Sequence, residues 1–503
     1  MRAHPHLYEL NALIFVKRLS EKHARPLTLA TVPQEEWQEL ARQGFDYIWL
    51  MGVWQRSPEA RKSALASADL RRYTSEILPG WNKEDVVASP YAVHTYEIDP
   101  ALGSAGDLAI VKAAINRAGM GLVLDFVPNH LALDHPWTRT HPQRFVCASD
   151  EAARAHADLF FKAGANHLAH GRDPYFPPWS DTVQVNFFST DTREALMREL
   201  ERIAEVADGV RCDMAMLGLN RIFASTWGAF TREFPLPSEE FWPRAVARAR
   251  KLRPDFLFIA EVYWDLEWEL QQLGFDFTYD KKLYDRLLNA PVADIRGHLR
   301  AEPAYQKRSI RFIENHDEQR AANAFGRERS QAAAVVTATV PGMRFFHDGQ
   351  LEGRRLHLPI QFAREPKEEV DLPLARFYDR LLAAAKGPVF HTQGPLTGPP
   401  GAKPTDGWLL LEPAAAWEGD QSWQNFLAWM WLKAPDSSVV IVNYSAERSQ
   451  GRIRIPVAAG ATAQVRLKEE LSGHTFLRTA SDLRTEGLYI DLPPWRSHIL
   501  TLL

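Results

Sequence analysis

Four apolar segments of the sequence end in an acidic side chain. Asp125 ends the segment GLVLD, Asp213 ends GVRCD, and Glu261 ends FLFIAE. Asp317 ends a fourth segment, RFIENHD. Burying a carboxylate is costly unless it is paired or functional, and four acids at the same level of related elements are hard to explain as structural ion pairs. The set predicts a catalytic site built from carboxylates.

The neighbours of two of these acids predict their chemical roles. Arg211 lies two residues before Asp213, so both side chains lie on one face of a strand. A guanidinium there favours the ionised carboxylate that a nucleophile needs. Glu261 follows an apolar run and precedes Tyr263 and Trp264, surroundings that raise a carboxyl pKa and keep a proton for donation. An ionised acid facing a protonated acid is the division of labour in glycoside hydrolysis.

The elements that must position these acids alternate in type. Over residues 8–385, short apolar runs alternate with longer amphipathic stretches, which is typical of a parallel sheet covered by helices. We count eight strand–helix units, if a helix lies between Asp280 and Ala301, and the first strand is predicted over Tyr8–Leu19. Eight units favour a closed (β/α)8 TIM barrel over a doubly wound sheet, and no G-x-G-x-x-G motif follows an early strand.

Two parts of the chain depart from this alternation. Residues 131–182 are irregular and rich in histidine, proline and aromatic residues, which predicts a small inserted lobe after the third strand. The last part shows short alternating strands separated by turn signals, which predicts a C-terminal antiparallel β-sandwich, with a loop at Gly394–Pro404 near the boundary. The predicted domains are therefore the barrel over 1–130 and 183–387, the lobe over 131–182, and the sandwich over 388–503.

Composition argues against several classes of function. The 503 residues include 59 Lys and Arg against 63 Asp and Glu, a net charge of −4, so we predict no nucleic-acid partner and no anionic membrane surface. No apolar run approaches the ~20 residues of a membrane span. Cys147 and Cys212 are too few for a disulfide framework. Met1–Asn11 has no apolar core of a signal peptide, so we predict a cytoplasmic protein.

The four acid-bearing segments resemble, in order, the four short signature segments of the alpha-amylase family of glycoside hydrolases. The segment DFVPNH from Asp125 resembles the first, GVRCD the second, the strand before Glu261 the third, and FIENHD the fourth. The resemblance spans roughly residues 8–385. It implies a retaining mechanism in which Asp213 is the nucleophile, Glu261 is the acid/base, and Asp317 stabilises the transition state.

The resemblance also implies contacts with a sugar and a metal. Tyr91 would stack on the sugar at the cleavage point. Asn129 matches the family's calcium-binding asparagine, with a loop-structuring amide as the alternative, while the chemistry itself requires no cofactor. Met216 and Leu217 stand where many starch-cleaving members carry Lys-His, so the leaving-group side is built differently. The other residues that would hold the sugar are Asp125, His130, Arg211 and His316.

We therefore expect a retaining α-glycoside hydrolase that acts on α-glucosidic bonds of malto-oligosaccharides or related α-glucans. A transglycosylase or isomerase of the same family, such as a glucanotransferase or a trehalose-forming enzyme, is the alternative. It would share the first half-reaction and exclude water from the second. A non-catalytic relative is disfavoured, because such relatives typically lose an acid and all three catalytic acids are present here.

Overall fold

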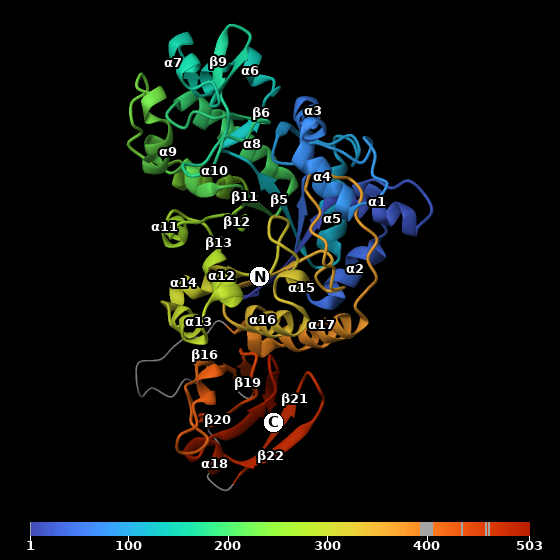
Figure 1. Cartoon of the computed structure of the whole chain (residues 1–503), viewed down its shortest axis with the longest axis vertical. Coiled ribbons are helices and arrows are strands. Elements are labelled where there is room, and N and C mark those ends of the chain that lie inside the picture. The colour runs from blue at the N-terminus through green and yellow to red at the C-terminus, as the bar shows by residue number, and fades with distance from the viewer. Residues whose placement is uncertain (1, 393–405, 434–435, 458–459, 461–462) are drawn as a thin grey trace.

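A closed barrel of eight parallel strands forms the centre of the protein in a computed structural model (Figure 1). The order around the barrel is β1-β15-β14-β13-β12-β11-β5-β2. This confirms the predicted (β/α)8 barrel. The structure describes residues 2–392, 406–433, 436–457, 460 and 463–503. The barrel strands are β1 (His6–Asn11), β2 (Tyr47–Met51), β5 (Gly121–Phe126), β11 (Gly209–Cys212), β12 (Leu257–Ala260), β13 (Phe277–Tyr279), β14 (Ser309–Arg311) and β15 (Met343–His347).

The first strand is shorter than the sequence pattern predicts. β1 ends at Asn11 and α1 (Ala12–Lys22) begins at once, so the predicted strand over Tyr8–Leu19 is wrong beyond its first four residues. The side-chain oxygen of Asn11 accepts hydrogen bonds from the backbone N–H groups of Leu13 and Ile14. These bonds satisfy two of the free donors at the start of the helix, and this cap outweighs the β-like apolar run that follows it.

Helices cover the outside of the barrel. The helix required between Asp280 and Ala301 is present as α12 (Lys281–Asn289) and α13 (Val292–Leu299), which confirms the eighth unit. Among the described residues, no helix has the length and apolar character needed to cross a membrane. The other helices around the barrel are α2 (Gln34–Gln43), α3 (Pro58–Ala66), α4 (Ala68–Ile77), α5 (Asp107–Arg117), α8 (Thr190–Val206), α9 (Asn220–Trp227), α10 (Phe241–Leu252), α11 (Glu267–Gln272), α14 (Pro303–Lys307), α15 (Ala321–Ala324), α16 (Arg327–Thr339) and α17 (Leu372–Ala385).

Between β5 and α8 the chain leaves the barrel and forms a lobe at one end of the molecule (Figure 1). The antiparallel pair β6 (His130–Ala132) and β10 (Thr182–Gln184) starts and ends the excursion. Both strands cross the predicted boundaries of the lobe, and the exact division into domains stays a prediction. The remaining lobe elements are β7 (Cys147–Ala148), β8 (Phe160–Ala163), β9 (Asn166–Ala169), α6 (Trp137–Thr140) and α7 (Asp150–Ala155).

The C-terminal part forms two antiparallel sheets at the opposite end of the molecule (Figure 1). One apolar cluster takes side chains from both sheets, including Met430 and Ile490, so the sheets pack face to face as predicted. The predicted loop at Gly394–Pro404 lies outside the described residues. The strands are β16 (Asp406–Leu410), β18 (Phe426–Lys433), β19 (Asp436–Asn443), β24 (Ser497–Leu502), β21 (Gln464–Glu469) and β22 (Thr475–Thr479) in one sheet, and β17 (Pro413–Ala414), β20 (Ser449–Ile453) and β23 (Leu488–Leu492) in the other, with α18 (Ala480–Thr485) beside them.

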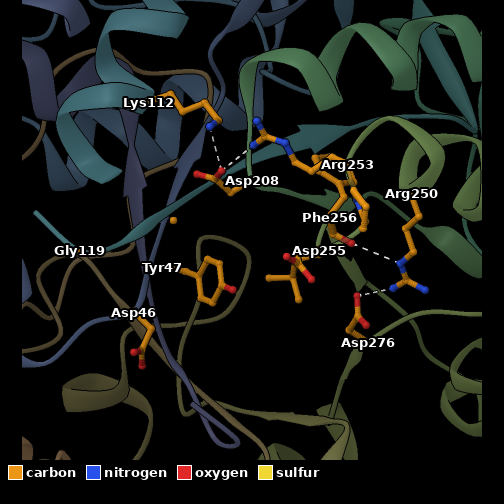
Figure 2. Close-up of a pocket in the computed structure, with 13 residues that line it drawn as sticks. Asp46, Tyr47, Lys112, Gly119, Asp208, Arg250, Arg253, Asp255, Phe256 and Asp276 are labelled. Carbon is orange, nitrogen blue, oxygen red and sulfur yellow. Dashed lines mark hydrogen bonds and ion pairs between the residues drawn. The ribbon is translucent and has the colours of Figure 1, made fainter. Parts of the chain in front are cut away.

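Ion pairs surround a cavity of about 810 Å³ at the N-terminal end of the barrel strands (Figure 2). Asp208 pairs with Lys112 and Arg253, and Arg250 pairs with Asp276. The carboxylates of Asp208 and Asp276 also accept hydrogen bonds from the backbone of β5 and β12. In this fold the end opposite the catalytic loops serves stability. We therefore assign these charges to holding the strands together.

Candidate active site

The predicted acids lie at the C-terminal ends of the barrel strands. Asp125 is the next-to-last residue of β5, while Asp213 and Glu261 follow directly after β11 and β12. Asp317 stands in the loop after β14, and its charge acts on both Asp213 and Glu261. The structure thus brings all four acids to one end of the barrel, where this fold carries its active sites.

Arg211 connects three of these acids. Its Nη1 lies 2.7 Å from Asp213 Oδ1 and 3.8 Å from Asp125 Oδ1, and its Nη2 lies 2.9 Å from Glu261 Oε2. The side chain is 1% exposed, so these charged contacts are made away from water and are strong. Three aromatic rings enclose the guanidinium at 5.1–5.7 Å from their centroids: those of Trp49, Tyr91 and Tyr279.

The backbone after β11 turns to hold Glu261. Met214 has a left-handed φ of 42°, which a non-glycine residue rarely adopts, and its N–H donates to Glu261 Oε2 at 2.7 Å. The hydroxyl of Tyr263 donates to Glu261 Oε1 at 2.8 Å. Burial raises the pKa of Glu261 to about 7; the charges of Asp213 and Asp317 also raise it, while Arg211 lowers it. Glu261 can therefore hold a proton near neutral pH.

Asp213 makes the shorter contact with Arg211 in this pair, at 2.7 Å. Burial raises its pKa above the ordinary value, which is opposite to the effect that the sequence predicts from Arg211 alone. The charge of Arg211 and its hydrogen bond at 2.7 Å limit that rise. The predicted division of labour, an ionised Asp213 facing a protonated Glu261, stays a prediction.

We expect the rate of glycoside cleavage to fall as the pH rises through about 7, because Glu261 donates a proton only while it is protonated and its pKa is raised to about 7. Above that pH, kcat/KM should fall about tenfold per pH unit. The measurement is the pH profile of kcat/KM on maltotriose. A profile that stays flat up to about pH 9 would show that a group other than Glu261 supplies the proton.

His316 contacts Asp317 and Tyr91 in the same opening. Its Nε2 lies 3.1 Å from Asp317 Oδ2 and 2.8 Å from the hydroxyl of Tyr91. Burial acts to raise the pKa of Asp317, but the charge and hydrogen bond of His316 outweigh it and lower that pKa to about 2. The Asp317 side chain is 46% exposed, so an ionised carboxylate faces the entrance of the site.

Tyr91 is largely buried, and its ring contacts two residues of the site. Its ring stacks on the imidazole of His316 with centroids 5.3 Å apart and planes 24° from parallel. The guanidinium of Arg211 also lies against it. The role of Tyr91 as a platform for the sugar at the cleavage point stays a prediction.

Two further predicted contacts lie beside the nucleophile. Asp125 Oδ2 accepts the N–H of Gly52 at 3.1 Å, whereas its buried Oδ1 has no hydrogen-bond partner among the residues that the structure describes. That oxygen is an unused acceptor within the site. His130 Nε2 lies 3.9 Å from Asp213 Oδ2, and burial lowers its pKa to about 4, so the ring is neutral at pH 7.

Asn129 is engaged within the protein. Its side-chain oxygen accepts a hydrogen bond from Gln184 at 3.0 Å, and its Nδ2 lies 3.4 Å from His130 Nδ1. Among the described residues, no group of three or more His, Cys, Asp or Glu side chains is placed to hold a metal ion. These contacts fit the loop-structuring role of Asn129. The calcium site that the resemblance implies stays a prediction, and no step of the chemistry is derived through a metal.

Residues after β11 and β12 lie on the side that the resemblance assigns to the leaving group. Met216 and Leu217 are buried in the short 3₁₀ helix Ala215–Gly218, so they offer this side neither a charge nor an open apolar face. Trp264 instead meets Tyr175 of the lobe edge to face, with centroids 4.9 Å apart. Tyr175 is 70% exposed, which leaves an aromatic surface between lobe and barrel.

Sequence analysis missed several residues that the structure brings to this site. Trp49 and Tyr279 enclose Arg211, and Glu9 contacts His316 from β1. Each of the two rings lies in an apolar run and resembles ordinary core in the sequence. Glu9 carried a signal, because it is an acid within a buried barrel strand.

Comparisons with known proteins agree with this architecture. A scan against protein-family models gives no match. The chain is 23% identical over 302 residues to Alpha-amylase 3 of Dictyoglomus thermophilum, covering 55% of this chain and 56% of that one. It is 25% identical over 287 residues to Alpha-amylase MalA of Haloarcula japonica, covering 54% and 38%. The match thus spans about half or less of the length of these curated relatives.

A solved structure extends the comparison over the whole fold. The noncanonic maltogenic alpha-amylase AmyB from Thermotoga neapolitana has a TM-score of 0.68 at 18% identity, covering 100% of this chain and 99% of that chain. Fold and site define a (β/α)8 barrel with acids at the carboxyl ends of its strands. The four signature-like segments and the curated relatives make the chain similar to alpha-amylases, and the solved structure shares its fold.

Proposed function

We propose that the protein is a retaining α-glycoside hydrolase acting on α-glucosidic bonds of malto-oligosaccharides or related α-glucans. The observation that carries the proposal is the pairing of Asp213 and Glu261 on one buried guanidinium, at 2.7 and 2.9 Å. Burial raises the pKa of Glu261 to about 7, so this acid can hold a proton near neutral pH, while the guanidinium of Arg211 favours an ionised Asp213. A two-carboxylate glycosidase requires one ionised and one protonated acid.

In the first half-reaction the ionised Asp213 attacks the anomeric carbon. Glu261 gives its proton to the departing glycosidic oxygen, so the bond to that oxygen breaks and a covalent glycosyl ester forms on Asp213. In the second half-reaction the Glu261 carboxylate takes a proton from water. The water oxygen bonds to the anomeric carbon, and Asp213 leaves as a carboxylate.

The surrounding polar groups hold the sugar during both steps. The free oxygen of Asp125 accepts a sugar hydroxyl, and Asp317 with His316 holds hydroxyls from the entrance side. The negative charge of Asp317 favours the positive charge that develops on the sugar ring in the transition state. We also propose that the protein is cytoplasmic and has no nucleic-acid partner.

The test is product analysis on maltotriose. Hydrolysis should give only glucose and maltose by chromatography, and proton NMR of the first products should show the α anomer because two inversions restore the configuration. The Asp213→Asn protein is the matched blank. If longer oligosaccharides or trehalose form, the protein is a transferase and the proposed hydrolysis is wrong. If the β anomer forms first, the mechanism is not retaining. If no α-glucoside is cleaved, the proposal is overturned.

A further inference from the structure

A buried carboxylate lies behind the histidine that faces the proposed sugar site. Glu9 is on β1 and is fully buried, with its Oε1 2.5 Å from His316 Nδ1. The other ring nitrogen of His316 faces Asp317 and Tyr91. A buried carboxylate is unfavourable unless it is paired or has a function. Glu9 has no part in the two half-reactions described above, so its position requires another explanation.

The two carboxylates determine how many protons the imidazole carries. A neutral imidazole has one N–H, whereas the imidazolium has two. His316 has a carboxylate at each nitrogen, at 2.5 Å for Glu9 and 3.1 Å for Asp317, and an ionised carboxylate can only accept. Both contacts are satisfied together only when both nitrogens donate.

We propose that Glu9 is a positioning residue that keeps His316 doubly protonated, so that its Nε2–H remains a donor directed at the sugar site. This role rests on the proposed glycosidase function for its consequence in catalysis. The positive charge on the imidazole of His316, which Glu9 stabilises, is present in the free protein and can be measured without a substrate.

Glu9 and Asp317 differ in how much of each side chain is exposed to water, and this difference distinguishes their effects on His316. Burial of His316 would lower its pKa, yet the charges and hydrogen bonds of Asp317 and Glu9 raise it well above the usual value. Asp317 is 46% exposed, so water weakens its hold and a bound sugar competes for it. Glu9 has no exposed surface, so its contact persists in either state.

The other charged groups near His316 do not replace Glu9. His347 lies 3.9 Å from Glu9 Oε2, and it is itself held by Glu314 and Arg320. His357 Nε2 donates to the backbone oxygen of His316, not to its ring. The titratable and charged groups around His316 are Glu9 from β1, Tyr91 from the loop before β4 (Val93–Ile98), Asp125 from β5, Asp317 from its own loop, and His357 from the loop after β15, with Arg211 from β11 behind the ring of Tyr91.

A charged donor changes what the site can hold. A hydrogen bond from a cation is roughly twice as strong as one between neutral groups. A neutral ring could also adopt the tautomer that carries its single proton on Nδ1, and Nε2 would then be an acceptor. By fixing both protons, Glu9 selects a substrate that offers an acceptor oxygen at this place, which a sugar hydroxyl does.

The test replaces Glu9 by glutamine. The amide keeps the size of the side chain and can accept from Nδ1–H, but it carries no charge. With [13Cε1]-histidine-labelled free protein, we expect the His316 signal of the wild type to stay that of an imidazolium over about pH 5–9, and that of Glu9→Gln to titrate within this range. The signal is assigned by its loss in His316→Gln. Glu9→Asp should restore the imidazolium, because it keeps the charge.

Kinetics give a second, independent readout. Glu9→Gln should lower kcat/KM on maltotriose by about tenfold at pH 8 and by less at pH 6, where His316 remains charged. A merely structural loss would be the same at both pH values. The matched control is Glu267→Gln, a buried acid on α11 outside the site, which should leave the profile unchanged.

Two results would overturn the role of Glu9. One is a His316 in Glu9→Gln that stays an imidazolium up to pH 9. The other, which needs no variant to fold, is a wild-type His316 that loses its proton near the ordinary value of about 6.5. If the NMR titration behaves as expected while the wild type cleaves no α-glucoside, then the proposed hydrolase function fails and the role of Glu9 in charging His316 stands.

Discussion

Replacing Asp213 by asparagine is expected to lower kcat on maltotriose by about 10⁴-fold or more, because an amide cannot form the glycosyl ester and the catalytic groups act as a unit. The side chains are nearly equal in size, and the amide oxygen can still accept the hydrogen bond from Arg211 that the carboxylate accepts at 2.7 Å. The fold should therefore survive. The measurement is single-substrate kinetics, accompanied by circular dichroism and thermal unfolding of both proteins.

The matched control is Asp276→Asn at the other end of the barrel. Asp276 pairs with Arg250 at 2.7 Å and accepts from the backbone of β12, so its loss should affect unfolding and not turnover. An Asp213→Asn protein that keeps more than about a tenth of the wild-type rate would remove Asp213 from the role of nucleophile. An unfolded variant would be recognised from its circular dichroism spectrum. In that case the role of Asp213 is decided by trapping the glycosyl ester on Asp213 in the wild-type protein and detecting it by mass spectrometry.

Replacing Glu261 by glutamine should have an effect that depends on the leaving group. On maltotriose, whose sugar leaving group needs a proton, kcat/KM should fall by about 10²–10⁴-fold. On an aryl α-glucoside with an acidic phenol, kcat/KM should fall much less, because that leaving group departs without a proton. The glutamine amide can still accept from Met214 N–H, which donates to Glu261 at 2.7 Å.

The pH profile checks the same assignment. The limb that we expect near pH 7 comes from Glu261, whose pKa is raised to about 7, so it should disappear in Glu261→Gln. The control is Glu318→Gln, since Glu318 is paired with Lys281 outside the proposed machinery. Equal losses on both substrates, with the limb retained, would mean that Glu261 positions another acid.

The acids could be predicted from the sequence because their placement follows from the barrel. A strand that is buried on both faces is a continuous apolar run, so Asp125, Asp213 and Glu261 are visible as acids where such runs end. The barrel also determines that the carboxyl ends of parallel strands meet. Neither step requires knowledge of side-chain packing.

What could not be predicted depends on contacts between distant segments. Arg211 was assigned to Asp213 alone, yet it also lies 2.9 Å from Glu261, and burial raises both pKa values. Glu9 and His316 are 307 positions apart, and only closure of the barrel brings them together. The start of α1 was missed because a single cap at Asn11 outweighs the local apolar pattern.

The ion pairs around the N-terminal end of the barrel have a consequence for how this chain can change over evolution. Asp208 and Asp276 hold strand starts at the end of the barrel opposite Asp213 and Glu261, and they lie outside the loops after β11 and β12. Substitutions in those loops can thus alter the proposed sugar site while the closure of the barrel is maintained elsewhere. We therefore expect the loop that carries Trp264 to diverge without a matching loss of stability at the far end.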